Sequence, residues 1–204
     1  LVESKKVNPD HILALTFTDK AAHEMLERMD IVMPLGYTEP WLSTFQHFCD
    51  RILQQEGMAV GLDPNYKILS SPEQWIFVKT HLFEFPLKTY RPLGNPTKFI
   101  SALLTFFSRA QDEAVSPDEL LKFAQKQHQP ELLEIAHSFK TYHDLKIANS
   151  VLDFGDLITK TIDLFTTRPS ILKKYQTQFE HILVDEFQDT NYAQYQLIKL
   201  LAPA

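Results

Sequence analysis

The stretch of residues 181–191 constrains the fold more than any other part of the sequence. Three apolar residues at 182–184 run directly into Asp185 and Glu186, and a polar segment follows. The apolar run predicts a short strand buried on both faces, as in a parallel sheet covered by helices. The two carboxylates then fall at the carboxyl end of that strand, where open α/β sheets bind their ligands. We therefore expect an α/β protein.

The chemistry predicted for this strand end is phosphate transfer. Asp189, Thr190 and Asn191 are residues that begin helices, and residues 193–201 have the pattern of the helix that follows. Carboxylates placed in this way hold Mg²⁺ and orient a water molecule. The alternative is a pair of solvated acids before a helix N-terminus, which the helix dipole also favours.

Composition limits the class of protein. The chain has 204 residues, of which 44% are hydrophobic, enough for a core in one or two domains. A net charge of −6 argues against nucleic-acid binding by bulk charge, so any such contact needs a local basic face. The single cysteine, Cys49, is typical of a reducing cytoplasm. The sequence has no apolar run of membrane-spanning length and no signal-peptide pattern, and its eight histidines lack zinc-site spacing.

A strand followed by a helix is predicted at residues 12–30. An apolar run ends in Thr16, Phe17 and Thr18, and Thr18 or Asp19 can cap the helix, in which apolar residues recur at helical spacing. A phenylalanine ring at a strand end is a platform on which a nucleobase can stack. The alternative is an ordinary strand–helix unit without a ligand.

A second helix is predicted after residue 44. Ser43 or Thr44 can cap it, and Gln46 and His47 in its first turn can donate hydrogen bonds to phosphate. His47 is equally compatible with a half-buried position at a helix start. We expect Cys49 to pack as a small apolar residue.

Residues 57–178 are mainly helical in pattern and separate the two sheet-forming regions. Between residues 86 and 111 the sequence has four basic residues and no acidic residue, with aromatic residues interleaved. The basic residues are Lys88, Arg91, Lys98 and Arg109. The stretch is the best candidate for a basic face toward nucleic acid. A solvated surface of a helix bundle is the alternative.

Four stretches resemble motifs of the UvrD/PcrA/Rep group of superfamily 1 DNA helicases, and they follow one another in the order that the family has. VDEFQDTN at 184–191 resembles motif II, the Walker B element, and LTFTDKAAHEM at 15–25 resembles motif Ia. STFQHFC at 43–49 resembles the next motif, and FFSRAQDE at 106–113 with LDFGDLI at 152–158 resembles the inserted helical subdomain. The chain departs from the family pattern at four positions. Asp19 stands where Asn is usual, and Gln46 where His is usual. His47 stands where Ser is usual, and Gly155 where a second acid is usual.

The resemblance implies a partial RecA-like P-loop NTPase domain, a parallel sheet with flanking helices, formed by residues 1–60 and 179–204. A mainly helical subdomain at residues 61–178 is inserted into it. The implied activity is ATP-driven movement on single-stranded DNA in the 3′ to 5′ direction, with unwinding of the duplex at single/double-strand junctions. The implied cofactors are ATP and Mg²⁺.

Site residues follow from the same resemblance. Asp185 and Glu186 are expected to bind Mg²⁺ through water, with Glu186 also orienting and deprotonating the attacking water. Gln188 is expected to link the nucleotide site to neighbouring motifs. The DNA strand is expected to contact residues of the first two strand–helix units and of the basic stretch: Thr16, Phe17, Thr18, Thr44, Phe45, Gln46, Lys88, Arg91 and Lys98.

ATP binding needs a Gly-rich loop ending in Gly-Lys-Thr or Gly-Lys-Ser, and the sequence has none. Because residue 1 is Leu rather than Met, we expect a segment of a longer chain, with that loop upstream and a second RecA-like domain downstream. We expect the segment alone to be inactive. Two alternatives for the whole protein stay open: a helicase–nuclease subunit of the RecB/AddA kind, and a degenerate member that binds DNA as a scaffold.

Overall fold

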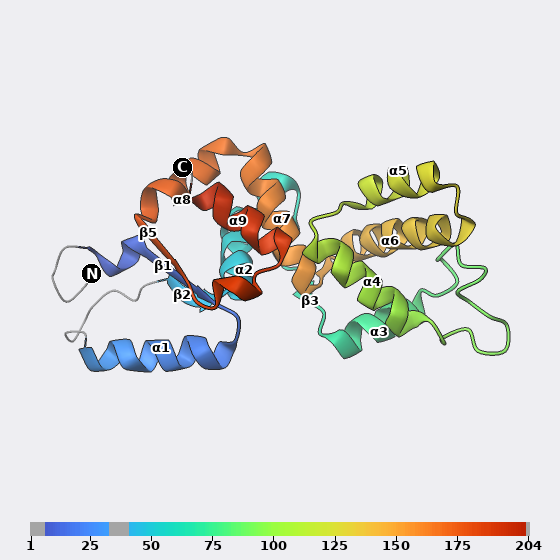
Figure 1. The fold of residues 1–204 in the computed structure, drawn as a ribbon, viewed down its shortest axis with the longest axis horizontal. Helices are drawn as coiled ribbons and strands as arrows, with labels where there is room; N and C mark the ends of the chain where they lie inside the picture. Colours follow the sequence, from blue (N-terminus) through green and yellow to red (C-terminus); the bar gives the residue numbers. More distant parts are fainter. Residues whose placement is uncertain (1–6, 33–40, 203–204) are drawn as a thin grey trace. The chain divides into compact units, whose positions relative to one another are not determined.

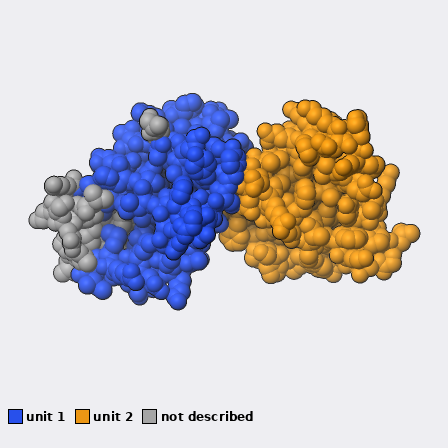
Figure 2. Space-filling model, in the orientation of Figure 1, with its two compact units in different colours: residues 1–64, 160–204 blue, residues 65–159 orange. Residues whose placement is uncertain are grey.

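The computed structural model describes residues 7–32 and 41–202, so the two chain ends, Leu1 and Ala204, lie outside the described residues. The chain forms two compact units (Figure 2). Unit 1 consists of residues 1–64 and 160–204, and unit 2 consists of residues 65–159. Each unit has its own sheet and its own helices, and each is described by itself.

Unit 1 is built on a three-stranded parallel sheet in the order β2-β1-β5 (Figure 1). Its strands are β1 (Ile12–Thr16), β2 (Trp41–Thr44) and β5 (His181–Val184). In the central strand, Leu13 lies opposite Trp41 on one side and Ile182 on the other. The carboxyl ends of all three strands therefore lie at one edge of the sheet, although the whole of unit 2 separates β2 from β5 in the sequence. The expected parallel sheet of an α/β protein is confirmed.

The prediction that residues 182–184 are buried on both faces is wrong for the described part of the chain. Leu183 is 51% exposed, whereas Leu13 in β1 is 0% exposed. The reason is that β5 pairs only with β1 among the described strands, so it is an edge strand. An apolar run shows that a segment needs cover on both sides, but it does not show where that cover comes from.

Unit 1 contains helices from both sides of unit 2 in the sequence, and capping side chains begin some of them. The helices are α1 (Asp19–Val32), α2 (Phe45–Glu56), the unit 1 part of α7 (Phe154–Thr167), α8 (Pro169–Gln178) and α9 (Tyr192–Leu201), with short 3-10 turns η1 (Pro9–His11), η2 (Gly57–Val60) and η3 (Phe187–Asp189). The Thr18 hydroxyl accepts the Ala21 N–H at 3.1 Å, and the Thr44 hydroxyl accepts the His47 N–H at 3.3 Å. These side chains satisfy backbone donors that the first helical turn leaves unpaired.

The compact units divide the chain differently from the expected boundary at residue 178. Residues 160–178, expected in the helical insertion, belong to unit 1. The physical reason is an aromatic cluster in which Tyr175 of α8 lies 6.3 Å from Trp41 and 6.1 Å from Phe179, measured between ring centroids. Tyr175 is fully buried there. The apolar surface of α8 is therefore part of the core beneath the sheet.

Unit 2 is a helical bundle with a small parallel sheet. It contains α3 (Ser71–Thr80), α4 (Ile100–Asp112), α5 (Pro117–Gln127), α6 (Pro130–Ala148) and the first residues of α7. Strands β3 (Lys67–Ile68) and β4 (Val151–Leu152) pair with each other, so the two ends of the unit meet. In the core, the Phe107 ring stacks 5.2 Å from Phe139 and 5.3 Å from Tyr142.

A buried ionic network joins α6 to the start of α7. The Lys146 ammonium lies 2.5 Å from a carboxylate oxygen of Asp153 and 2.5 Å from one of Asp156. The Tyr142 hydroxyl donates to Asp153 at 3.0 Å, and the Gln111 amide donates to Asp153 at 2.9 Å and to Asp156 at 3.0 Å. Buried charges are tolerated only when paired and hydrogen-bonded in this way.

The network sets the ionisation of its members. Burial lowers the pKa of Lys146, but the two aspartates raise it by more, so its pKa lies above the usual value. Burial raises the pKa of Asp153, but Lys146 together with the hydrogen bonds from the Asp156 backbone and the Gln111 amide lowers it by more, so its pKa lies below the usual value. Lys146 is therefore charged and holds Asp153 as a carboxylate.

Gly155, where the family usually has a second acid, is explained by the same network. A Cβ atom added at Gly155 would lie 2.5 Å from the side-chain amide oxygen (Oε1) of Gln111 and 3.0 Å from the Gln111 Cβ. No side chain fits at position 155 while Gln111 holds its present place. The departure from the family pattern is thus coupled to the glutamine that binds both aspartates.

Replacing Lys146 tests the network. Lys146→Ala should destabilise unit 2 by about 3–5 kcal/mol, because the buried Asp153 carboxylate loses its cation. The wild-type contribution of Asp153 is present above about pH 4 and is lost as the pH falls through its lowered pKa, whereas the mutant must fold with its carboxylates protonated. The difference between the proteins should therefore shrink from about pH 7 to about pH 4 in urea unfolding followed by tryptophan fluorescence. Lys140→Ala, on the surface of the same helix, is the control and should cost under about 1 kcal/mol. A similar loss for both variants would contradict this account.

Candidate functional site

The carboxyl end of β5 carries the two predicted carboxylates. The Asp185 N–H donates to the Leu15 carbonyl oxygen at 2.9 Å, so the pairing of β5 with β1 continues one residue beyond the strand. Asp185 is half-buried and Glu186 is exposed. The strand therefore fixes the backbone of Asp185, while Glu186 stands at the edge of the sheet, open to solvent.

Glu186 has the left-handed backbone conformation, with φ 48° and ψ 44°. A non-glycine residue in this region stores strain on the order of 1–3 kcal/mol, and such residues cluster at functional sites. Two backbone hydrogen bonds hold the turn: the Asp189 N–H donates to the Glu186 carbonyl at 2.8 Å, and the Thr190 N–H donates to the Phe187 carbonyl at 3.2 Å. Because Glu186 has this backbone conformation, its side chain leaves the chain in a different direction from that of a residue in an extended strand.

The structure brings Gln188 and Glu186 together. The Gln188 side-chain amide donates a hydrogen bond to Oε2 of Glu186. Within the described ranges, no group of three or more His, Cys, Asp or Glu side chains could hold a metal ion. Asp185 and Glu186 fit Mg²⁺ nonetheless, since Mg²⁺ is usually bound by one or two carboxylates together with waters and substrate phosphates.

The carboxyl end of β1 lies beside this site. Leu15 is paired with Val184, so Phe17 and Glu186 each stand two residues beyond the same pair. The Phe17 ring is half-buried and lies 5.6 Å from the Phe45 ring, which is fully buried. Phe45 thus supports Phe17 from the core and has no exposed surface for DNA. Thr16 is also buried, so neither residue supports the predicted direct contact.

A pocket of about 460 Å³ lies along β2 and is lined by that strand, α1 and α2. Its polar lining comes from α1 and α2 and from the end of β2: Asp19, His23, Ser43, Thr44, His47 and Arg51. The Arg51 guanidinium lies 3.5 Å from the centre of the Trp41 ring, a cation–π contact. Sequence reasoning missed Arg51, although it stands four residues after His47 and so lies on the same face of α2.

The basic stretch of unit 2 is held by an acid that is distant in the sequence. Glu134 of α6 accepts three consecutive backbone N–H groups: those of Lys88 at 2.7 Å, Thr89 at 3.2 Å and Tyr90 at 3.0 Å. Burial raises the pKa of Glu134, but these donors lower it by more, so its pKa lies below the usual value. Lys88 and Lys98 are exposed. The ammonium groups of Lys88 and Lys98 are therefore accessible to solvent, while Glu134 fixes the backbone of residues 88–90.

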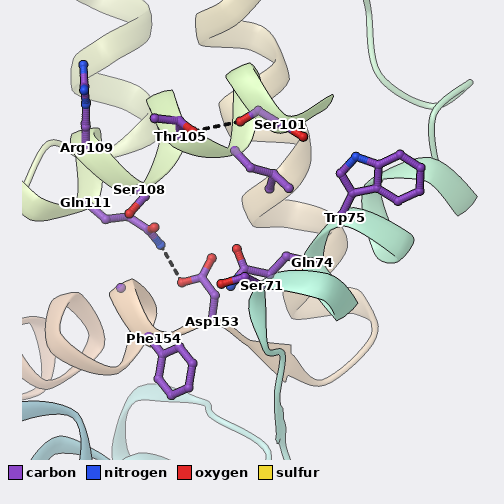
Figure 3. Close-up of a pocket in the computed structure, with 12 residues that line it drawn as sticks. Ser71, Gln74, Trp75, Ser101, Thr105, Ser108, Arg109, Gln111, Asp153 and Phe154 are labelled. Carbon is purple, nitrogen blue, oxygen red and sulfur yellow. Dashed lines mark hydrogen bonds between the residues drawn. The ribbon is translucent and has the colours of Figure 1, made fainter. Parts of the chain in front are cut away.

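A second pocket, of about 530 Å³, lies within unit 2 (Figure 3). Trp75 of α3 and Phe154 of α7 line it together with the hydroxyls of Ser101, Thr105 and Ser108 on α4. Phe154 is 47% exposed although Asp153 beside it is buried. Aromatic rings near hydroxyl groups can bind a nucleobase and its phosphate. Sequence reasoning did not find this pocket, because its lining comes from three separate segments of unit 2.

The expectation that Cys49 packs as a small apolar residue is confirmed. Cys49 is fully buried, and burial raises the pKa of its thiol to about 12, so it packs as an apolar residue and is not a nucleophile. In the described portion of the chain, no helix combines the length and apolar character needed to cross a membrane.

Comparison with known proteins agrees with the geometry. Residues 1–204 match the profile of the UvrD/REP helicase N-terminal domain. The chain belongs to this family. The expected resemblance to UvrD, PcrA and Rep helicases is thereby confirmed.

Relatives of this UvrD/REP family chain include proteins named ATP-dependent DNA helicase PcrA. The proteins from Bacillus subtilis and Leuconostoc citreum are 38% identical to it over 203 and 205 residues, and the protein from Staphylococcus aureus is 37% identical over 202 residues. Each match covers 99% of the chain but 26% of the relative. The chain thus spans about a quarter of the length of these relatives.

The strained backbone at Glu186 predicts a gain in stability when the side chain is removed. Glu186→Gly should stabilise unit 1 by about 1 kcal/mol, because glycine adopts positive φ without a steric cost. Urea unfolding of the chain measures this change. Ala202→Gly, at φ −111°, is the control and should lower stability, since it adds chain entropy without relieving strain. Destabilisation by both substitutions would show that Glu186 is not strained.

Proposed function

We propose that this UvrD/REP family chain is part of an ATP-dependent DNA helicase, in which a RecA-like domain couples ATP hydrolysis to movement on single-stranded DNA. The observation that carries the proposal is the parallel register of β1 and β5. It puts Asp185 and Glu186 at the same sheet edge as Phe17 and Thr18. The names of the PcrA relatives support the same activity.

Each residue at the strand end has a role that its position supports. Asp185, whose backbone is fixed by β1, would hold Mg²⁺ through water; the bound ion would neutralise the terminal phosphates of ATP. Glu186, exposed beside it, would orient the attacking water and accept its proton. Unit 1 carries both carboxylates at the edge of its sheet, which is the arrangement that this chemistry requires.

DNA would be held at the neighbouring strand ends. Phe17 offers a partly exposed ring supported by a buried one, and the pocket along β2 offers Arg51 and His47 to phosphate oxygens. Because Phe17 and Glu186 are two residues beyond one strand pair, a shift of β5 on hydrolysis would move the DNA contact with it. This shared pair is the proposed basis of coupling.

The finer properties of the whole protein rest on the family. We infer movement in the 3′ to 5′ direction, action at single/double-strand junctions, and a role for residues 65–159 as the inserted subdomain. The chain by itself should be inactive, because its sequence has no Gly-rich phosphate-binding loop. A RecB/AddA-like subunit is the second candidate; a nuclease motif elsewhere in the full-length protein would decide for it. The intact Asp185–Glu186 pair favours turnover over a degenerate scaffold.

Removing the proposed general base tests the reaction. In the full-length protein, Glu186→Gln should lower kcat for DNA-stimulated ATP hydrolysis at least about 100-fold, because a general base contributes factors of this size. Binding of a non-hydrolysable ATP analogue should change by less than about threefold, since the amide keeps the shape of the side chain. Glu180→Gln, just before the opposite end of β5, is the control and should retain wild-type turnover. Near-normal hydrolysis in Glu186→Gln would rule out the assigned base.

The basic stretch of unit 2 is tested by the salt dependence of DNA binding. Replacing Lys88, Arg91 and Lys98 by Ala should reduce the slope of log affinity against log salt by about 2, since each lost phosphate contact removes about 0.7–0.9. The measurement is fluorescence anisotropy of labelled DNA with the full-length protein. Lys122, Lys126 and Lys140 replaced together by Ala give the same charge change elsewhere in unit 2. An equal slope for the two triple variants would mean that the stretch is only a solvated surface.

A further inference from the structure

The side chain of Gln188 has no role in holding the turn in which it lies. The turn is fixed by the backbone bonds from Asp189 to Glu186 and from Thr190 to Phe187, and the Thr190 hydroxyl adds a bond to the Phe187 carbonyl at 2.8 Å. Gln188 is exposed, so it contributes little to the core. Its amide is instead directed at the Glu186 carboxylate.

Glu186 needs such a partner if its carboxylate is to stay in one place. The left-handed backbone fixes the direction in which the Glu186 side chain leaves the chain, but its remaining side-chain torsions are free because the residue is exposed. A hydrogen bond from an amide removes much of this freedom. The Gln188 amide takes Oε2, which leaves Oε1 open to a water molecule.

We propose that Gln188 is a positioning residue that holds the Glu186 carboxylate oriented for the attacking water. The inference rests on the proposed function and adds a residue to it: Gln188 would act through Glu186, to which its amide donates a hydrogen bond. A displacement of about 1 Å in a catalytic group can cost on the order of 100-fold in rate, so a single orienting bond has a measurable effect.

Steady-state ATP hydrolysis by the full-length protein gives the first test. Gln188→Ala should lower kcat about tenfold and leave KM for ATP within about twofold, because the base is misplaced while the phosphate contacts are kept. Gln188→Glu should lower kcat further, since a second carboxylate repels Glu186. Gln54→Ala, an exposed glutamine on α2, is the control and should match wild type. An equal kcat for Gln188→Ala and wild type would overturn the inference.

A double-mutant cycle separates positioning from a general structural effect. If Gln188 acts through Glu186, adding Gln188→Ala to Glu186→Gln should leave the residual single-turnover rate unchanged, so the two effects do not add. A further tenfold loss in the double variant would show that Gln188 acts independently of Glu186 and would overturn the inference alone. A wild-type protein without ATP hydrolysis would overturn the proposed function and the inference with it.

Discussion

Parallel pairing of β1 with β5 is the interaction on which the candidate site depends. The central strand is buried and paired on both sides, and it fixes β5 residue by residue from Ile12 opposite His181 to Leu15 opposite Val184. Only this register brings the turn that carries Asp185 and Glu186 to the sheet edge at which Phe17 follows β1. A slip of one residue would reverse the faces of β5 and redirect both carboxylates.

Local features of the fold were predictable because their determinants lie within a few residues of one another. The start of α1 at Thr18 and of α2 at Thr44 follow from a hydroxyl and an N–H group three residues later. The strand at 181–184 and its terminal carboxylates were also found, since an apolar run followed by acids is a short-range signal. Its burial was not, because cover depends on which strands and helices come to lie beside it.

Non-local contacts explain what the sequence could not show. The basic stretch contains no acidic residue, yet its backbone N–H at Lys88 donates a hydrogen bond to Glu134, which is more than forty residues away in the sequence. Gln111 and Gly155 depend on each other through a contact that no local pattern predicts. The pocket beside Trp75 combines residues from three segments of unit 2. Such sites require the tertiary structure before their residues can be recognised as neighbours.

Unit 2 is inserted in the sequence between the two segments of unit 1, which has a consequence for how the protein folds during synthesis. β1 and β2 leave the ribosome long before β5, so the sheet cannot be completed until residue 184 has been made. Unit 2 is one continuous stretch of sequence, and the pairing of β3 with β4 brings its two ends together. This pairing replaces a long flexible loop by a short closed connection, which reduces the entropic cost of bringing β5 to β1. Pairing of β3 with β4 therefore favours formation of the β2-β1-β5 sheet.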